Sequence, residues 1–239
     1  MGKDIRLSRE RVAGASAFYG KNQITPQRTL LRIEVDLVDG QGIYAFDIKK
    51  KGKDKSITER SITDNDLFVV DSLGLALTVE KDAAPGTAPL LSYPLINGLH
   101  LPAGIKGFTD NHAYAVYNGI LSVKTDQTVN ISAYPTANFL RVPQTQPVGV
   151  LTSEDVVVTT GIQPEFDLDS VLTQLSETLV FAGNHETEIK LEAPVKADVT
   201  LGVPADYTGK AVLLVDGWLF AGGAKPQYAI DGNPFKNAI

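Results

Sequence analysis

The sequence predicts a mainly β protein made of two β-sandwich units, of the jelly-roll kind, with one or two short helices. The first observation is a strand in which Leu31, Ile33, Val35 and Leu37 alternate with charged residues and therefore share one face. The second is that short apolar runs recur from this strand to Phe220, separated by Gly, Pro, Asn and Asp residues that favour turns. Helical spacing, in contrast, stands out at a single segment.

The elements of the first half follow from these two patterns. Asp39-Gly40 is a tight-turn signal that predicts a hairpin to a second strand over 43–48. Residues 64–80 predict one or two strands broken near Gly74, and the Pro- and Gly-rich residues 82–110 predict short strands between turns, one of them over 90–96. Further strands are expected over 113–117, 120–124, 129–134 and 139–142.

The second half contains the segment with helical spacing. Pro143, Pro147 and Gly149 mark a linker, after which residues 155–160 predict a strand. A helix is expected over 168–179, where five aliphatic residues recur at spacings of mostly three and four. Strands are expected over 187–191, 199–203 and 212–220, the last of them split at Asp216-Gly217.

The domain prediction is a basic N-terminal arm over 1–27, a first sandwich over 28–143 and a second sandwich over 150–239 that ends in an extended C-terminal tail. Residues 113–123 and 211–221 look alike, because each has an apolar strand, an Asn-Gly or Asp-Gly pair and a second apolar strand. This likeness favours a duplicated β-domain. The alternative is that such turns are simply common between apolar strands.

Composition limits the class of protein. The chain has 239 residues, of which 43% are apolar, enough to bury a core. We expect no transmembrane helix and no secretory signal, because no run of about 18 apolar residues occurs and the start lacks an apolar core. The absence of cysteine excludes disulfides and thiolate nucleophiles and fits folding in a reducing cytoplasm.

Charge is divided unevenly along the chain. Residues 1–28 carry six Lys or Arg against two Asp or Glu, a net charge of +4. Because the whole chain has a net charge of −6, residues 29–239 have a net charge of −10. The arm residues Lys3, Arg6, Arg9 and Arg11 are therefore candidates for contact with an anionic genome or lipid surface. The alternative is an ordinary solvated terminus.

No motif for catalysis is present. The chain lacks GxSxG, GxGxxG, HExxH and Walker patterns. Asp64 and Asp66 suit a turn better than a calcium site. In a strand, His185 would point away from Glu186 and Glu188, which makes a catalytic pair awkward there. We therefore predict no catalytic, cofactor-binding or metal-binding residue and no enzyme, although a glycosidase using two carboxylates is an open alternative.

In its general features the chain resembles the jelly-roll capsid proteins of icosahedral viruses. These features are the basic arm, the successive strands, the proline-rich linker and the absence of cysteine and of active-site motifs. The likeness between residues 113–123 and 211–221 makes the chain most similar to the double jelly-roll major capsid proteins of tailless, membrane-containing phages.

The resemblance implies a structural virion protein that forms an icosahedral shell from homotrimers, with other virion proteins as partners and assembly in the host cytoplasm. It also implies that the arm meets genome or inner-membrane lipid. A single jelly roll with insertions is the alternative fold. A phage tail, baseplate or decoration protein, or a glycan-binding β-sandwich, is the alternative function.

Overall fold

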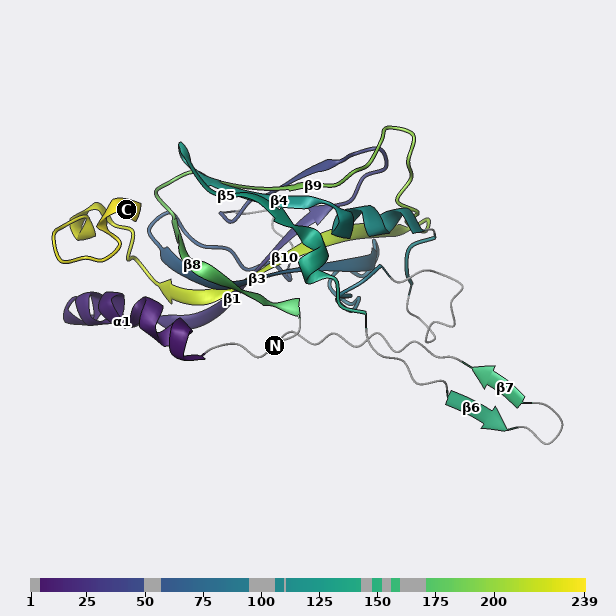
Figure 1. Cartoon of the computed structure of the whole chain (residues 1–239), viewed down its shortest axis with the longest axis horizontal. Helices are drawn as coiled ribbons and strands as arrows, with labels where there is room; N and C mark the ends of the chain where they lie inside the picture. The colour runs from purple at the N-terminus through teal and green to yellow at the C-terminus, as the bar shows by residue number, and fades with distance from the viewer. Residues whose placement is uncertain are drawn as a thin grey trace.

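Two four-stranded antiparallel sheets pack face to face in the computed structural model, which describes residues 5–49, 57–94, 106–109, 111–142, 148–151, 156–159 and 171–239 (Figure 1). The long sheet has the order β1 (Gln27–Asp36), β10 (Tyr207–Phe220), β3 (Leu67–Lys81), β8 (Thr173–Ala182). The short sheet has the order β2 (Ile43–Phe46), β9 (Thr187–Glu192), β4 (Ile120–Thr125), β5 (Thr128–Pro135). The prediction of a mainly β sandwich is confirmed.

The strand pairing is that of a single jelly roll. Numbered along the chain, the first of the eight sandwich strands pairs with the eighth, the second with the seventh, the third with the sixth and the fourth with the fifth. Two further pairs, β10 with β3 and β9 with β4, close each half into a sheet. This pattern is one long hairpin folded across itself, which is how a jelly roll is formed.

The division into two sandwich units at 28–143 and 150–239 is corrected by this order. The long sheet takes β1 and β3 from before the predicted linker and β8 and β10 from after it, and the short sheet is mixed in the same way. Because the first strand pairs with the last, neither half of the chain can complete a sheet alone. The chain therefore forms one sandwich, and residues 113–123 and 211–221 are not equivalent parts of two domains.

The core fills the space between the two sheets. Alternate residues of β1, including Leu31 and Ile33, point inward as the period of two predicted, and they meet Tyr44 and Phe46 from the short sheet. The inner cluster consists of apolar and aromatic side chains. β3 and β10 are buried on both faces, because other segments also cover the outside of the long sheet.

Two predicted strand breaks, near Gly74 and at Asp216-Gly217, are wrong, and both fall in strands that are buried on both faces. β3 runs through Gly74 for 15 residues without a break, and β10 runs through Asp216-Gly217 for 14 residues. Between Asp216 and Gly217 the strand continues while its register on β3 shifts by one residue, because Asp71 of β3 has no partner on β10. A Cβ on Gly217 would lie 2.2 Å from the carbonyl oxygen of Val69, so glycine permits the close strand approach.

The predicted helix over 168–179 is wrong from residue 173, where β8 begins; Val171 is helical, and residues 168–170 lie outside the described residues. Leu175 and Leu179 are four residues apart, a spacing that also places two side chains on one face of a strand. Thr173, Thr178 and Val180 favour extended backbone. The spacing was therefore ambiguous, and the β-branched residues were the better signal.

Three other segments differ from the predicted strands. Residues 113–117 lie in the 3-10 helix η2 (Asn111–Asn118), Phe139 ends the short helix η3 (Thr136–Phe139), and residues 199–203 form no strand. The Asp39-Gly40 turn carries the chain from one sheet to the other, so β1 and β2 are not a hairpin. It is held by Leu201 N–H, which donates to Asp39 Oδ1 at 2.6 Å.

Helix α1 and the C-terminal segment form compact structure at the same end of the sandwich (Figure 1). Residues 5–21 of the predicted arm form helix α1 (Ile5–Lys21), and the predicted extended tail instead forms turns and the short helices η4 (Pro226–Tyr228) and η5 (Lys236–Ala238). At the other end, β6 (Val148–Leu151) and β7 (Val156–Thr159) form a separate two-stranded sheet. The strand predicted over 155–160 is confirmed by β7.

Candidate functional site

Helix α1 and residues 221–239 form one unit, the terminal cap, on the outer face of the long sheet. Val12, Ala15 and Tyr19 follow one face of α1 and are buried against strand residues that include Phe220. Tyr19 is the centre of the unit, with its ring centroid 5.0 Å from that of Phe220 and 5.5 Å from that of Tyr228. The cap thus ties the two chain ends to the sandwich and to each other.

The Tyr19 hydroxyl joins three segments. It donates a hydrogen bond to the Gly223 carbonyl oxygen at 2.9 Å and accepts one from Asn233 Nδ2 at 2.9 Å. Burial raises the pKa of Tyr19, which keeps the hydroxyl protonated and able to donate. Asn233 is itself buried and also donates to the Tyr228 carbonyl oxygen at 2.8 Å.

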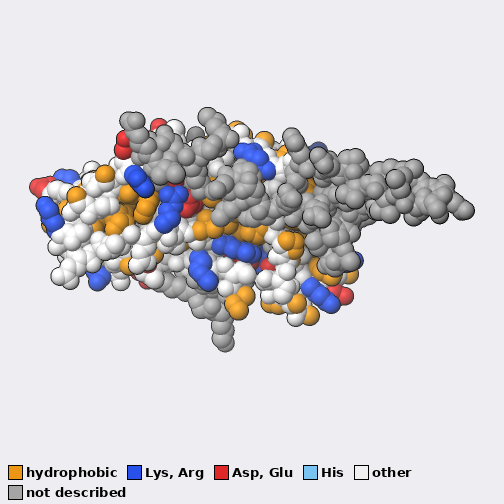
Figure 2. Space-filling view, turned by 90° about the horizontal axis from the view of Figure 1, so that it is seen from below, with side chains coloured by type: hydrophobic (Ala, Val, Ile, Leu, Met, Phe, Trp, Pro, Cys, Tyr) orange, Lys and Arg blue, Asp and Glu red, His pale blue; other side chains and the backbone are white. Residues whose placement is uncertain are grey.

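The cap is basic and the rest of the chain is acidic. Helix α1 carries four Lys or Arg against one Glu, and residues 221–239 add two lysines against one aspartate. Of the predicted arm residues, Arg9 is exposed on α1, Arg6 and Arg11 belong to the same helix, and Lys3 lies outside the described residues. Figure 2 shows several lysine and arginine side chains at the end of the molecule that carries the cap.

An arginine clamp lies beside the cap on the outer face of the long sheet. Arg28 on edge strand β1 donates from Nε to Asp216 Oδ1 at 3.0 Å and from Nη2 to Asp71 Oδ2 at 3.0 Å. Its guanidinium carbon lies 5.5 Å from the centroid of the Trp218 ring. The clamp therefore links three strands of the sheet and gives the charge of Arg28 a structural role.

A buried charge network lies farther along the same face. The carboxylate of Glu34 accepts from Lys210 Nζ at 3.1 Å, from Arg32 Nε at 2.8 Å and from the Thr58 hydroxyl. Lys210 Nζ also lies 2.9 Å from Glu80 Oε2. Burial alone would raise the pKa of Glu34, but these hydrogen bonds and charges together hold it below its ordinary value of 4.5.

This lowered pKa predicts acid sensitivity. A carboxylate with a depressed pKa stabilises the folded state above its unfolded pKa, and that contribution is lost as the pH falls through the folded pKa. We expect the free energy of unfolding to fall as the pH drops below about 4.5 and the fall to be shallower in Glu34→Gln. Chemical denaturation between pH 3 and 7 measures it; equal slopes in both proteins would contradict the expectation.

A histidine–carboxylate pair lies at the edge of the short sheet, where the sequence did not predict one. His185 Nδ1 contacts Asp126 Oδ2, and the Glu186 N–H donates to Asp126 Oδ1 at 3.0 Å. The pKa of Asp126 is lowered, mainly by the hydrogen bond from the Glu186 amide and secondly by the contact with His185. In the described part of the chain His185 Nε2 has no hydrogen-bond partner, so the imidazole holds no nucleophile in place. The pair fastens two neighbouring turns.

Asp66, in the segment 64–66, also has a structural role. Asp66 Oδ2 accepts from the Thr63 backbone N–H at 2.9 Å and its hydroxyl at 2.8 Å, and Asp66 Oδ1 accepts from Gly222 N–H at 3.0 Å. Asp66 therefore closes a turn and anchors the start of the C-terminal segment. Within the described residues no three His, Asp or Glu side chains are grouped as a metal site would require.

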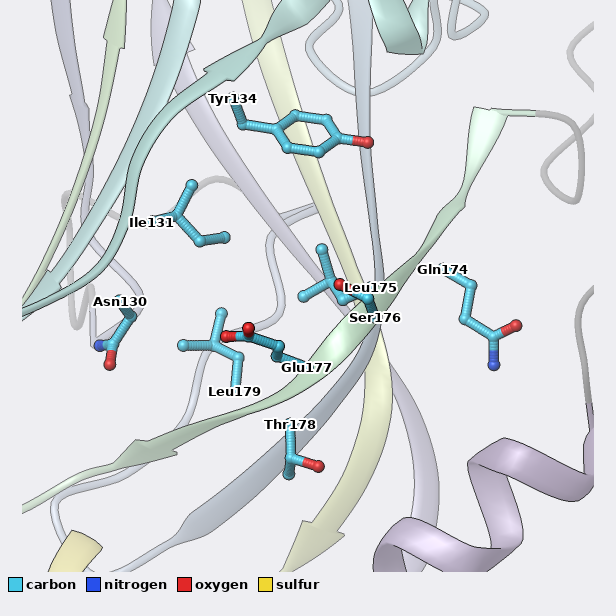
Figure 3. Close-up of a pocket in the computed structure, with 9 residues that line it drawn as sticks. All are labelled: Asn130, Ile131, Tyr134, Gln174, Leu175, Ser176, Glu177, Thr178 and Leu179. Carbon is cyan, nitrogen blue, oxygen red and sulfur yellow. The ribbon is translucent and has the colours of Figure 1, made fainter.

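A cleft separates the edge strands of the two sheets on one side of the sandwich (Figure 3). Its volume is about 310 Å³; Ile131 and Tyr134 project from β5, and Leu175 and Leu179 from β8. Polar side chains complete its lining, namely Asn130, Gln174, Ser176, Glu177 and Thr178. The cleft exists because residues 175–178 of β8 do not pair with β3. These four residues lie opposite the single β3 residue Asp71, so β8 bulges away from β3 there.

Comparison with family models, with curated proteins and with solved structures found no match. None of the helices among the described residues combines the length and the apolar character that a membrane crossing requires.

Proposed function

We propose that this chain is a structural protein of a virion, a capsid protein that builds a closed icosahedral shell from copies of itself. The observation that carries the proposal is the single eight-stranded jelly roll whose two termini are gathered into one basic cap. A jelly roll is a closed wedge with protected faces, and viral capsid domains are among the proteins that use it. A shell also requires one surface that differs chemically from the rest, which the cap supplies.

The interior of the sandwich supports a structural role over the other uses of this fold. Jelly rolls also occur in cupins and lectins. The space between the sheets is filled by apolar and aromatic side chains such as Phe68 and Phe181. Among the described residues, the large apolar side chains that are well exposed are all aliphatic, whereas a sugar platform uses exposed aromatic rings. These observations favour assembly over ligand chemistry.

Charge indicates the orientation of the subunit in the shell. The cap carries the positive charge and the remaining chain is strongly acidic. A cap that faces inward would place Arg9 and its neighbouring basic residues against an anionic genome or inner-membrane lipid. The acidic sandwich would then form the outer wall.

Replacing the arm residues by serine is expected to weaken nucleic-acid binding and make it less dependent on salt. Every phosphate that the variant no longer neutralises should reduce the slope of log K against log salt by roughly 0.7–0.9. The substituted residues are Lys3, Arg6, Arg9 and Arg11. Fluorescence anisotropy with a single-stranded oligonucleotide across a salt series measures the slope.

The matched control removes the same number of charges from outside the cap. It replaces four lysines by serine, namely Lys106, Lys124, Lys190 and Lys196. The proposal predicts a near-normal salt slope for this control. An equal loss in both variants would show that net charge, and not the cap, determines binding.

The subunit count of the building block is a separate matter. The double jelly-roll resemblance implied a homotrimer with pseudo-sixfold shape, but each chain supplies one sandwich, so the trimer no longer follows from it. The mass of the unassembled oligomer in solution gives this count. A phage tail, baseplate or decoration protein with this fold would form rings, tubes or an added layer in place of a closed shell of its own.

A further inference from the structure

Glu177 is a charged residue on the inward side of an edge strand. Alternation along β8 places it on the same side as Leu175 and Leu179, which pack in or against the inner core cluster. Figure 3 shows the Glu177 side chain turned toward β5, whereas Thr178 projects to the other side of β8. Because Glu177 is exposed, its carboxylate lies where the cleft between β5 and β8 meets the solvent.

The rest of this inward surface is apolar and firmly supported. Ile131 and Tyr134 of β5 are half-buried, and both pack against the inner core cluster, as Leu175 does from β8. The centroid of the Tyr134 ring also lies 5.4 Å from that of the Phe139 ring. Side chains supported in this way form an apolar wall that is ready for a ligand, and a volume of about 310 Å³ is enough for a small one.

The polar part of the lining supplies one charge and no counter-charge. Glu177 is the only charged residue among the nine that line the cleft. The Asn130 amide is held by its own chain, because Nδ2 donates to Thr125 Oγ1 at 2.9 Å. Gln174 Nε2 likewise donates to Asp71 Oδ1 at 3.3 Å. A ligand with an apolar chain and a positive end matches both parts of the cleft, because it covers the apolar wall and brings a charged donor to the carboxylate.

We propose that the cleft between β5 and β8 binds an aliphatic ammonium ion. Its alkyl chain lies on Ile131, Tyr134 and Leu175, and its ammonium group binds the carboxylate of Glu177. Free alkylamines and lysine side chains share this chemistry. The cleft is separate from the filled interior of the sandwich, so the site goes beyond the proposed assembly function and does not depend on it. The competing explanation is that an inward-facing charge protects a sheet edge against strand addition, a role that needs no ligand.

Calorimetric titration of the full-length chain with n-pentylammonium tests the role of the charge. The affinity is expected to fall about fivefold in Glu177→Gln, which retains the shape of the side chain. The matched control Glu192→Gln removes an exposed glutamate of β9 that is not part of the lining, and it should bind like the unaltered chain. The neutral analogue 1-pentanol should bind the unaltered chain and Glu177→Gln equally.

A series of alkyl chains tests the apolar wall without any substitution. From methylammonium to n-pentylammonium the affinity should rise about two- to fourfold with each methylene group, because each one buries further apolar area. Nα-acetyl-lysine methylamide carries the same ammonium chain on a peptide backbone. Binding as strong as that of n-butylammonium extends the site to lysine side chains of proteins, and weaker binding confines it to free amines.

Two results overturn the proposal. The first is a titration without saturable binding of n-pentylammonium, which leaves Glu177 as a charge that protects the edge. The second is binding that is as strong in Glu177→Gln as in the unaltered chain, or that does not depend on chain length. Either form of the second result places the amine elsewhere on the acidic surface of the protein.

Discussion

Lys210→Met is expected to lower the free energy of unfolding by about 3–5 kcal/mol. Lys210 lies between two carboxylates, 3.1 Å from Glu34 and 2.9 Å from Glu80, and both are almost fully buried. Methionine retains the apolar stem but leaves two buried negative charges without this ammonium group. Removing one partner of a buried ion pair costs more than the pair contributes, because the remaining charge stays buried without it. Glu34 keeps Arg32 as a partner, so the larger part of the loss is expected from Glu80. Denaturant unfolding at pH 7 measures the loss.

Two further variants make this result specific. Lys190→Met removes a lysine that pairs with Glu188 on the exposed face of the short sheet, and little change is expected there. Adding Glu34→Gln and Glu80→Gln to Lys210→Met should recover part of the loss, because the uncompensated charges disappear. A Lys210→Met protein as stable as the unaltered chain would show that the network is solvated.

Tyr19→Ala is expected to cost about 3–5 kcal/mol, the usual range for removing a large buried aromatic side chain. The ring packs between Phe220 and Tyr228, and its hydroxyl joins Gly223 to Asn233. Without it, α1 loses its hydrogen bonds to Gly223 and Asn233 and its closest ring contact with Tyr228. Hydrogen exchange should therefore show that protection disappears first in α1 and in residues 221–239, with the sandwich strands still protected.

Tyr19→Phe divides this effect into two parts. Phenylalanine retains the stacked ring but leaves the Gly223 carbonyl and the Asn233 amide without their shared partner, which costs about 1–2 kcal/mol. We expect the cap to stay docked in this variant. A uniform decrease of protection across the sandwich in Tyr19→Ala, with no earlier decrease in the cap, would contradict the role of Tyr19 as its anchor.

The local pattern predicted most of the strands, because a period of two depends on neighbouring residues. Leu31, Ile33 and Val35 were placed correctly on the inner face, and the hairpin of β4 and β5 lies where the apolar runs after Asn118-Gly119 indicated. The pairing of strands was not predictable in this way. β1 meets β10 across almost the whole chain, and no residue in either strand identifies its partner.

In the candidate site, too, the local sequence character was predictable and the long-range contacts were not. The basic character of the N-terminal segment was readable from Arg6, Arg9 and Arg11, but its docking was not. Tyr19 binds Gly223 and Asn233, which lie 204 and 214 residues away in the chain. His185 likewise pairs with Asp126, 59 residues distant, and not with the adjacent glutamates that the sequence drew attention to. Such contacts depend on the folded topology.

The mass and shape of the assembled protein test the central proposal most directly. The purified full-length chain is concentrated at low and at physiological salt, and its mass is measured by light scattering and its shape by negative-stain electron microscopy. A shell protein forms closed particles of one size, with a mass that is an integral multiple of 25.7 kDa. A protein that remains a 25.7 kDa monomer at every concentration and salt level would contradict the proposal.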